Sequence, residues 1–191
     1  MSLIPAFEIG VWNAWIFMLY ILAHTTLLSL LFKNASKKIG SPSKLPYTES
    51  ENRINVFRHV ILVLTFIYSV FLPLRLVTAW FYIGLPVYLV GLIMYTIVMV
   101  NFATTPPDEP VIKGLYRYSR HPQYLTQSLM FIGIGIASTS WVFLLFQIIT
   151  MILINILAIP EERFCLDKYG DAYREYLNRT PRWVGVPRSG R

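Results

Sequence analysis

The chain has 191 residues, of which 55% are hydrophobic and 14% are charged, and its mean hydropathy is +0.51. Soluble domains carry about 25% charged residues, so this composition excludes an ordinary water-soluble domain and indicates a membrane protein built as one bundle. The net charge of +7 is spread over segments that flank apolar runs, which argues against nucleic-acid binding, and the single cysteine, Cys165, excludes an intramolecular disulfide.

Long apolar runs predict the membrane-spanning helices. About 20 apolar residues cross the hydrocarbon core of a bilayer. Residues 11–32, 54–72 and 79–102 meet this length, whereas residues 124–159 are too long for one crossing. The small, hydroxyl-rich stretch at 137–140 predicts a tight turn within that last run. The sequence therefore predicts an all-α membrane protein with five transmembrane helices, the last two forming a helical hairpin with a short first arm.

The basic residues predict the orientation of these spans. With five spans, every Lys and Arg except Arg58 and Arg75 falls in segments 33–53, 103–123 and 160–191, which share one side of the membrane. Because Lys and Arg favour the cytoplasmic side, the N-terminus is expected outside and the tail inside the cytoplasm. A four-span arrangement would place the tail opposite the other two basic segments.

The chain divides at about residue 100. Residues 1–99 contain three membrane helices, and the first two of these carry no recognisable motif. Residues 100–191 contain the hairpin, the tail and the segments that are candidates for chemistry. The basic segment at 33–53 is interpreted as a solvated loop, which leaves two cytoplasmic segments to compare.

The segment at 104–124 is the first candidate. Its prolines exclude a helix at 104–110. The aromatic and basic residues at 116–118 are explained as interfacial anchors of a membrane helix. That explanation suits the Arg-His-Pro sequence at 120–122 less well.

The segment at 160–177 is the second candidate. Its apolar and aromatic residues recur at three- and four-residue spacing, which predicts an amphipathic helix at the membrane interface. Pro160 followed by Glu161 and Glu162 is typical of a helix N-terminus. Carboxylates at this depth cost free energy unless they are paired or functional. A structural and a functional role for the two glutamates therefore stay equally open.

Several chemistries lack their motifs. The sequence has no phosphate-binding loop, and its one Gly-x-Gly, at Gly133 and Gly135, lies in a predicted membrane helix. No nucleophile elbow is present. Three isolated histidines and one cysteine make a metal site improbable.

Two blocks resemble the isoprenylcysteine carboxyl methyltransferase and phospholipid methyltransferase superfamily of integral membrane methyltransferases. The resemblance covers roughly residues 100–183. The first block precedes the hairpin and contains Gly114, Tyr116, Arg120, His121, Pro122, Gln123 and Tyr124. The second block follows the hairpin and contains Glu161, Glu162, Tyr169, Gly170, Tyr173, Tyr176 and the sequence Thr180-Pro181-Arg182-Trp183.

The resemblance implies S-adenosylmethionine as methyl donor, S-adenosylhomocysteine as product, no metal, and a lipophilic acceptor that enters from the bilayer. It implies cofactor contacts from Asn101, Asp108, Glu109, Pro110, Val111, Tyr116, His121, Pro122, Gln123, Tyr124 and Glu161. Glu162 and Arg163 are the implied catalytic candidates. Glu162 or His121 would be the base for an amine acceptor, and Arg163 would replace the arginine that isoprenylcysteine enzymes have where this chain has Leu157.

The prediction is therefore S-adenosylmethionine-dependent methyl transfer to a membrane-embedded, lipid-like acceptor. The expected acceptor is a carboxylate, as in isoprenylcysteine O-methylation. A carboxylate needs no base whereas an amine does, and the residues alone do not decide between them. Phospholipid N-methylation stays open as an alternative. So do an NADPH-dependent reductase similar to some sterol reductases and a non-enzymatic membrane scaffold.

Overall fold

The computed structural model describes residues 8–31, 45 and 47–186, so most of the basic segment at 33–53 lies outside the described residues. The described chain is helical, which confirms the predicted all-α class. Its elements are α1 (Trp15–Leu31), α3 (Glu49–Val70), α4 (Ala79–Ala103), a 3₁₀ turn η2 (Gly114–Arg117), α5 (Pro122–Ala137), α6 (Trp141–Tyr169) and α7 (Asp171–Arg179).

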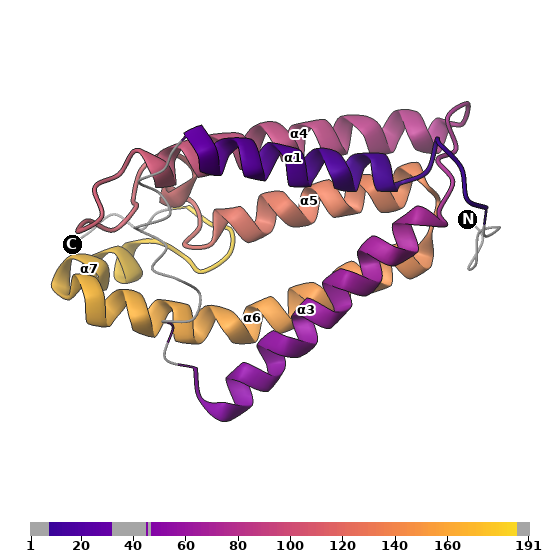
Figure 1. Ribbon diagram of the computed structural model, residues 1–191. Coiled ribbons are helices and arrows are strands. Elements are labelled where there is room, and N and C mark those ends of the chain that lie inside the picture. Colours follow the sequence, from indigo (N-terminus) through magenta and orange to yellow (C-terminus); the bar gives the residue numbers. More distant parts are fainter. Residues whose placement is uncertain (1–7, 32–44, 46, 187–191) are drawn as a thin grey trace.

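Helices α1, α3, α4, α5 and α6 run between the same two ends of the molecule (Figure 1). One end carries the α3–α4 connection and the α5–α6 turn, and the other carries η2 and α7. By length and composition, α3, α4 and α6 could each cross a membrane. The helices α1 and α5 are shorter, with 17 and 16 residues. The described chain thus shows three long candidate spans and two shorter helices beside them.

The predicted turn inside the last apolar run is confirmed. Helix α5 ends at Ala137 and α6 begins at Trp141. Ser140 caps α6 by accepting a hydrogen bond from the Phe143 backbone N–H at 3.2 Å. Its hydroxyl also lies 3.0 Å from the Tyr68 hydroxyl of α3. Between the two helices, Thr139 has a φ of 55°, which is uncommon for a β-branched residue and makes the reversal tight.

Glycines allow α4 and α5 to pack backbone against backbone. A Cβ atom on Gly84 would lie 2.6 Å from the Gly133 carbonyl oxygen, and one on Gly133 would lie 2.5 Å from the Tyr88 nitrogen. Close approach of this kind is how helices associate in membranes, where lipid tails are as apolar as leucine. This contact holds α5 against α4. The other end of α5, which begins at Pro122, lies at the candidate site.

The prediction that a helix begins at Pro160 is wrong. Helix α6 runs through Pro160 without a break and ends at Tyr169. The apolar turns before Pro160 continue the helix into it, and membrane helices tolerate an internal proline. Gly170, with a φ of +56°, separates α6 from α7. Glu161 and Glu162 therefore lie within a long helix, and only α7 is a separate amphipathic element.

Gly84→Ala tests the close α4–α5 contact. Alanine is favoured over glycine inside a helix by about 1 kcal/mol, so an unconstrained site would become more stable. Because the new methyl group meets backbone atoms that cannot move aside, we expect a loss of about 1–3 kcal/mol instead. Thermal unfolding in detergent measures the change, with Ala79→Val at an exposed position of α4 as the control. A stabilised Gly84→Ala protein would contradict this packing.

Candidate functional site

The segment before α5 is folded back onto the ends of α4 and α7. Val111 and Tyr116 pack with Val98 of α4 in a small buried cluster. Gly114 has a φ of +62° and lies against the Asn101 side chain, so a larger residue would fit neither the backbone nor the space. The Tyr176 hydroxyl of α7 donates to the Tyr116 carbonyl at 2.7 Å. These contacts hold Ser119, Arg120 and His121 at the start of α5.

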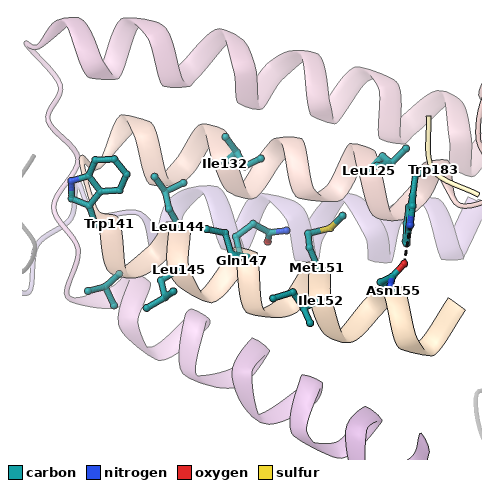
Figure 2. A pocket seen from close by; sticks show the side chains of 12 residues that line it. Leu125, Ile132, Trp141, Leu144, Leu145, Gln147, Met151, Ile152, Asn155 and Trp183 are labelled. Carbon is teal, nitrogen blue, oxygen red and sulfur yellow. Dashed lines mark hydrogen bonds between the residues drawn. The ribbon is translucent and has the colours of Figure 1, made fainter. Parts of the chain in front are cut away.

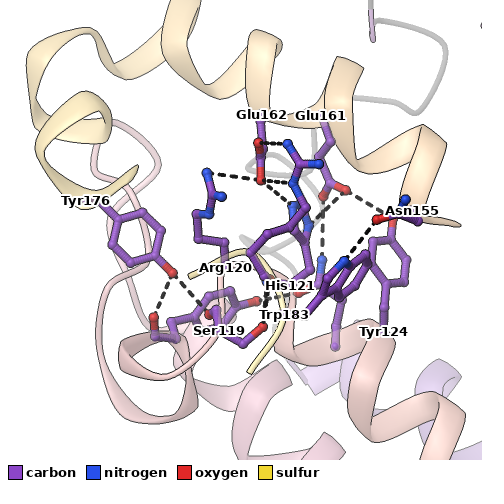
Figure 3. A network of polar contacts seen from close by, with 12 residues as sticks. Ser119, Arg120, His121, Tyr124, Asn155, Glu161, Glu162, Tyr176 and Trp183 are labelled. Atoms are coloured by element: carbon purple, nitrogen blue, oxygen red, sulfur yellow. Dashed lines mark hydrogen bonds and ion pairs between the residues drawn. The ribbon is translucent and has the colours of Figure 1, made fainter. Parts of the chain in front are cut away.

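A buried carboxylate lies at the centre of the site (Figure 3). The Glu162 side chain is 9% exposed and lies 3.2 Å from Arg120 Nη1. It accepts hydrogen bonds from Arg182 Nη2 at 2.8 Å and Arg182 Nε at 3.1 Å. His121 Nε2 lies 3.1 Å from the same carboxylate. A buried charge is tolerated when it is paired and hydrogen-bonded, and Glu162 meets both conditions.

His121 is the N-cap residue of α5 and is almost completely buried. Its ring stacks on Tyr124, with 5.8 Å between ring centroids, and lies at the same distance from Trp183 at an angle of 44°. Burial opposes its charge, but hydrogen bonds and charges from Glu161 and Glu162 outweigh burial and raise the pKa of His121 above 6.5. Its Nδ1 lies 3.5 Å from Glu161 Oε2, so a protonated His121 forms an ion pair with each of the two glutamates.

Glu161 has different surroundings from Glu162. Its side chain is 27% exposed and forms no ion pair with an arginine of the described chain. It accepts a hydrogen bond from the Tyr124 hydroxyl at 3.1 Å and lies 3.5 Å from Gln123 Nε2. The Tyr116 hydroxyl donates to Gln123 Oε1 at 3.1 Å. This carboxylate is therefore bordered by phenol and amide groups and stays open to a ligand.

The structure brings together some of the predicted site residues and separates others. Tyr116, His121, Gln123, Tyr124, Glu161 and Glu162 form one connected network, with Pro122 buried at the first position of α5. Of the other predicted residues, Asn101 lies near the end of α4, and Pro110 and Val111 lie in the segment between α4 and η2. Asp108 and Glu109 belong to the same segment and are exposed. Arg163 lies apart and pairs with Glu51 of α3 at 2.9 Å, while Leu157 is buried.

Two site residues were given no role by the sequence, namely Arg182 and Trp183. Both follow α7, in a segment that is hydrogen-bonded to the start of α5. The Arg120 backbone N–H donates to the Pro181 carbonyl at 3.1 Å, and the Ser119 hydroxyl donates to the Arg182 carbonyl at 3.1 Å. The need of a buried Glu162 for counter-charges is the signal that could have pointed to Arg182. Trp183 directly follows it in the same block of the sequence.

An apolar groove of about 1160 Å³ runs along α5 and α6 on one side of the site (Figure 2). The Trp183 indole N–H donates to Asn155 Oδ1 at 2.9 Å at one end of this groove. The remaining lining is mainly aliphatic and aromatic, with Gln147 as a further polar residue. The groove offers an apolar chain a place beside the polar network.

Glu162→Gln tests the buried charge cluster. The variant leaves Arg120, His121 and Arg182 without their shared anion, and removing one partner of a buried pair costs about 3–5 kcal/mol. Because Arg182 is one-third exposed, we expect a loss near the lower end, about 3 kcal/mol. Thermal unfolding of the detergent-purified protein measures it. Glu161→Gln is the matched control and should cost less, so equal losses would contradict the difference between the two glutamates.

The raised pKa of His121 predicts a dependence of stability on pH. A group with a raised pKa in the folded state contributes stability that is complete below pH 6.5 and disappears as pH rises through the raised pKa. The difference in Tm between wild type and His121→Gln should therefore be largest at about pH 6 and shrink in alkaline buffer. A thiol-reactive dye at the single Cys165 can report unfolding. A difference that grows with pH would show that His121 is neutral.

Comparison with known protein families gives one match. The family model described as phospholipid methyltransferase matches residues 74–172, just over half of the chain. The match includes α4, α5 and α6 and therefore His121, Glu161 and Glu162, but not Arg58 or Arg182. No curated protein and no solved structure is significantly similar to the chain.

Proposed function

The chain belongs to the phospholipid methyltransferase family, a family of membrane methyltransferases, and from this premise we propose that it transfers a methyl group from S-adenosylmethionine to a lipid-like acceptor in the bilayer. The observation that carries the proposal is the network of Glu161, Tyr124, Gln123 and His121 at one end of the helix bundle. It joins a partly exposed carboxylate, phenols and a cationic histidine, which are the groups that this donor needs.

The residues present fit the methyl donor. Its sulfonium is a cation, for which the Glu161 carboxylate and the Tyr124 ring are suitable partners. Its amino-acid part carries a carboxylate, and the buried guanidinium of Arg120 has an N–H group, at Nε, with no hydrogen-bond partner in the described chain. Buried donors of this kind are costly unless a ligand meets them. Asn101 and the segment 108–111 would complete the binding site from behind Tyr116.

The pairing of Glu162 favours an acceptor that arrives as an anion. When bound, the donor supplies an electrophilic methyl group, and an attacking carboxylate oxygen takes it as the S–C bond breaks, leaving a neutral thioether with no proton to remove. An amine acceptor would need a base. Against the effect of burial, two arginines and His121 lower the pKa of Glu162, so it is a weak base, and the raised pKa of His121 means that its ring holds its own proton and takes up another group's proton less readily. O-methylation of a carboxylate is therefore the preferred assignment, as in isoprenylcysteine methylation.

Phospholipid N-methylation is the second candidate, and the family match favours it. In that case Glu161, the less paired glutamate, is the group able to accept the proton of an ammonium. Arg163 directly follows Glu162 on α6, but its guanidinium pairs with Glu51 of α3, which suits a role in holding α3 beside α6. Product analysis with carboxylate and amine acceptors separates the two activities.

The membrane arrangement is part of the proposal. We take α1, α3, α4, α5 and α6 all as spans, with the N-terminus outside and the site in the cytoplasm. Supporting this, η2 and α7 lie at the end opposite the α5–α6 turn (Figure 1), and the network is at that same end because His121 caps the start of α5. The basic residues Lys113, Arg117 and Lys168 belong to the same end, where the positive-inside rule expects them. A water-soluble donor then meets the protein from the cytoplasm and the acceptor meets it from the bilayer.

Glu161→Gln and Glu162→Gln separate the proposed donor contact from the structural charge. Loss of the Glu161 charge should weaken S-adenosylmethionine binding by about tenfold, since the sulfonium loses its charged partner and an interaction with a charged group contributes about 1.5–3 kcal/mol. The effect of Glu162→Gln on this affinity should be smaller in protein that is still folded. Calorimetric titration at a temperature below both unfolding transitions measures the two. Equal losses would overturn the assigned roles.

A further inference from the structure

Arg58 is a half-buried arginine in α3, within the second predicted membrane span. An arginine inside a membrane helix is costly unless it meets a counter-charge or a polar cavity. All ten Asp and Glu side chains of the chain lie in the part that the structure describes. None of them forms an ion pair with Arg58, although six other arginines of the described chain have such partners.

The guanidinium of Arg58 is held in place by neutral groups. Its Nη2 lies 3.2 Å from Asn55 Oδ1 and 3.2 Å from His59 Nε2. His59 Nδ1 lies 2.7 Å from the Asn55 carbonyl oxygen, so this nitrogen carries the proton and Nε2 accepts from Arg58. Both contacts use the same nitrogen, which leaves donors at Nη1 and Nε. The charge of Arg58 is therefore oriented but not neutralised.

Arg58 lies on the side of α3 that packs against α5 and α6. It lines a small cavity of about 30 Å³, with room for one water molecule, whose polar residues include Gln127 and Ser128 of α5 and Gln147 of α6 and whose apolar residues include Leu62 and Phe131. Burial and the charge of Glu161 raise the pKa of Tyr47, while Arg58 acts in the opposite direction. Tyr47 thus lies within electrostatic reach of both Arg58 and Glu161. The larger groove on α5 and α6 has no charged residue in its lining.

We propose that Arg58 binds the anionic group, a carboxylate or a phosphate, of the membrane-embedded acceptor and thereby sets its position beside Glu161. Calling the bound anion the acceptor rests on the proposed methyl transfer, whereas the anion site itself does not. A guanidinium is well suited to carboxylate and phosphate oxygens through charge-assisted hydrogen bonds. At this depth in α3 it would meet a head group whose apolar chain stays in the bilayer. Arg58 is in this account a residue for acceptor specificity outside the matched family region.

Single-chain amphiphiles that share a dodecyl chain test the site without requiring activity. The probes are dodecanoate, dodecyl phosphate, neutral dodecanol and cationic dodecyltrimethylammonium, titrated into the full-length protein in a neutral detergent. Wild type should bind at least one anion more tightly than the alcohol or the cation. Arg58→Gln should weaken that anion about tenfold, as expected for a lost charge-assisted hydrogen bond, and Arg58→Lys should restore part of it. Preference for dodecanoate or for dodecyl phosphate identifies the head group.

Arg75→Gln is the matched control, because Arg75 is an exposed arginine in the α3–α4 connection, which lies at the end of the bundle opposite η2 and α7 (Figure 1). It should bind the anions as wild type does. S-adenosylhomocysteine binding, measured on the same samples, should be unchanged in Arg58→Gln, which also shows that the variant is folded. Equal anion affinity in wild type and Arg58→Gln would overturn the inference, as would no preference for anions in wild type. If wild type does not bind S-adenosylhomocysteine, the proposed function is overturned, whereas the anion site is unaffected.

Discussion

The charge of Glu162 is the constraint on which the rest of the site depends. A carboxylate that is 9% exposed is stable only if opposite charges surround it, and here three side chains from two segments supply them. Arg120 and His121 come from the start of α5, and Arg182 comes from the segment after α7. The ion pairs therefore close the C-terminal segment over the start of the helical hairpin. They also place the His121 ring between Tyr124 and Trp183.

The two adjacent glutamates divide the tasks because they follow one another on a helix. Successive residues of an α-helix point about 100° apart, so Glu162 faces the arginines and Glu161 faces Tyr124 and Gln123. One charge is used to hold the fold, and the other stays partly exposed for a ligand. The pairing that makes Glu162 a good structural anion makes it a poor base. This division is the physical reason to prefer an acceptor that needs no deprotonation.

The sequence predicted those features that follow from local rules. Apolar run length and the 137–140 stretch predicted the long helices and the hairpin, and the motif residues His121, Glu161 and Tyr124 do lie together. The start of a helix at Pro160 was predicted wrongly because proline at a first turn and proline inside a membrane helix look alike over a few residues. Arg182 and Arg58 were not assigned because their positions depend on how distant segments pack, which no local pattern encodes.

Equilibrium binding of S-adenosylmethionine to the detergent-purified, full-length protein tests the central claim most directly. The account predicts saturable binding that S-adenosylhomocysteine competes for and NADPH does not, and that His121→Ala abolishes or strongly weakens. His121→Ala must be shown to be folded, by thermal unfolding, at the temperature of the assay. Saturable binding of NADPH without binding of S-adenosylmethionine by wild type would contradict the account and favour a reductase.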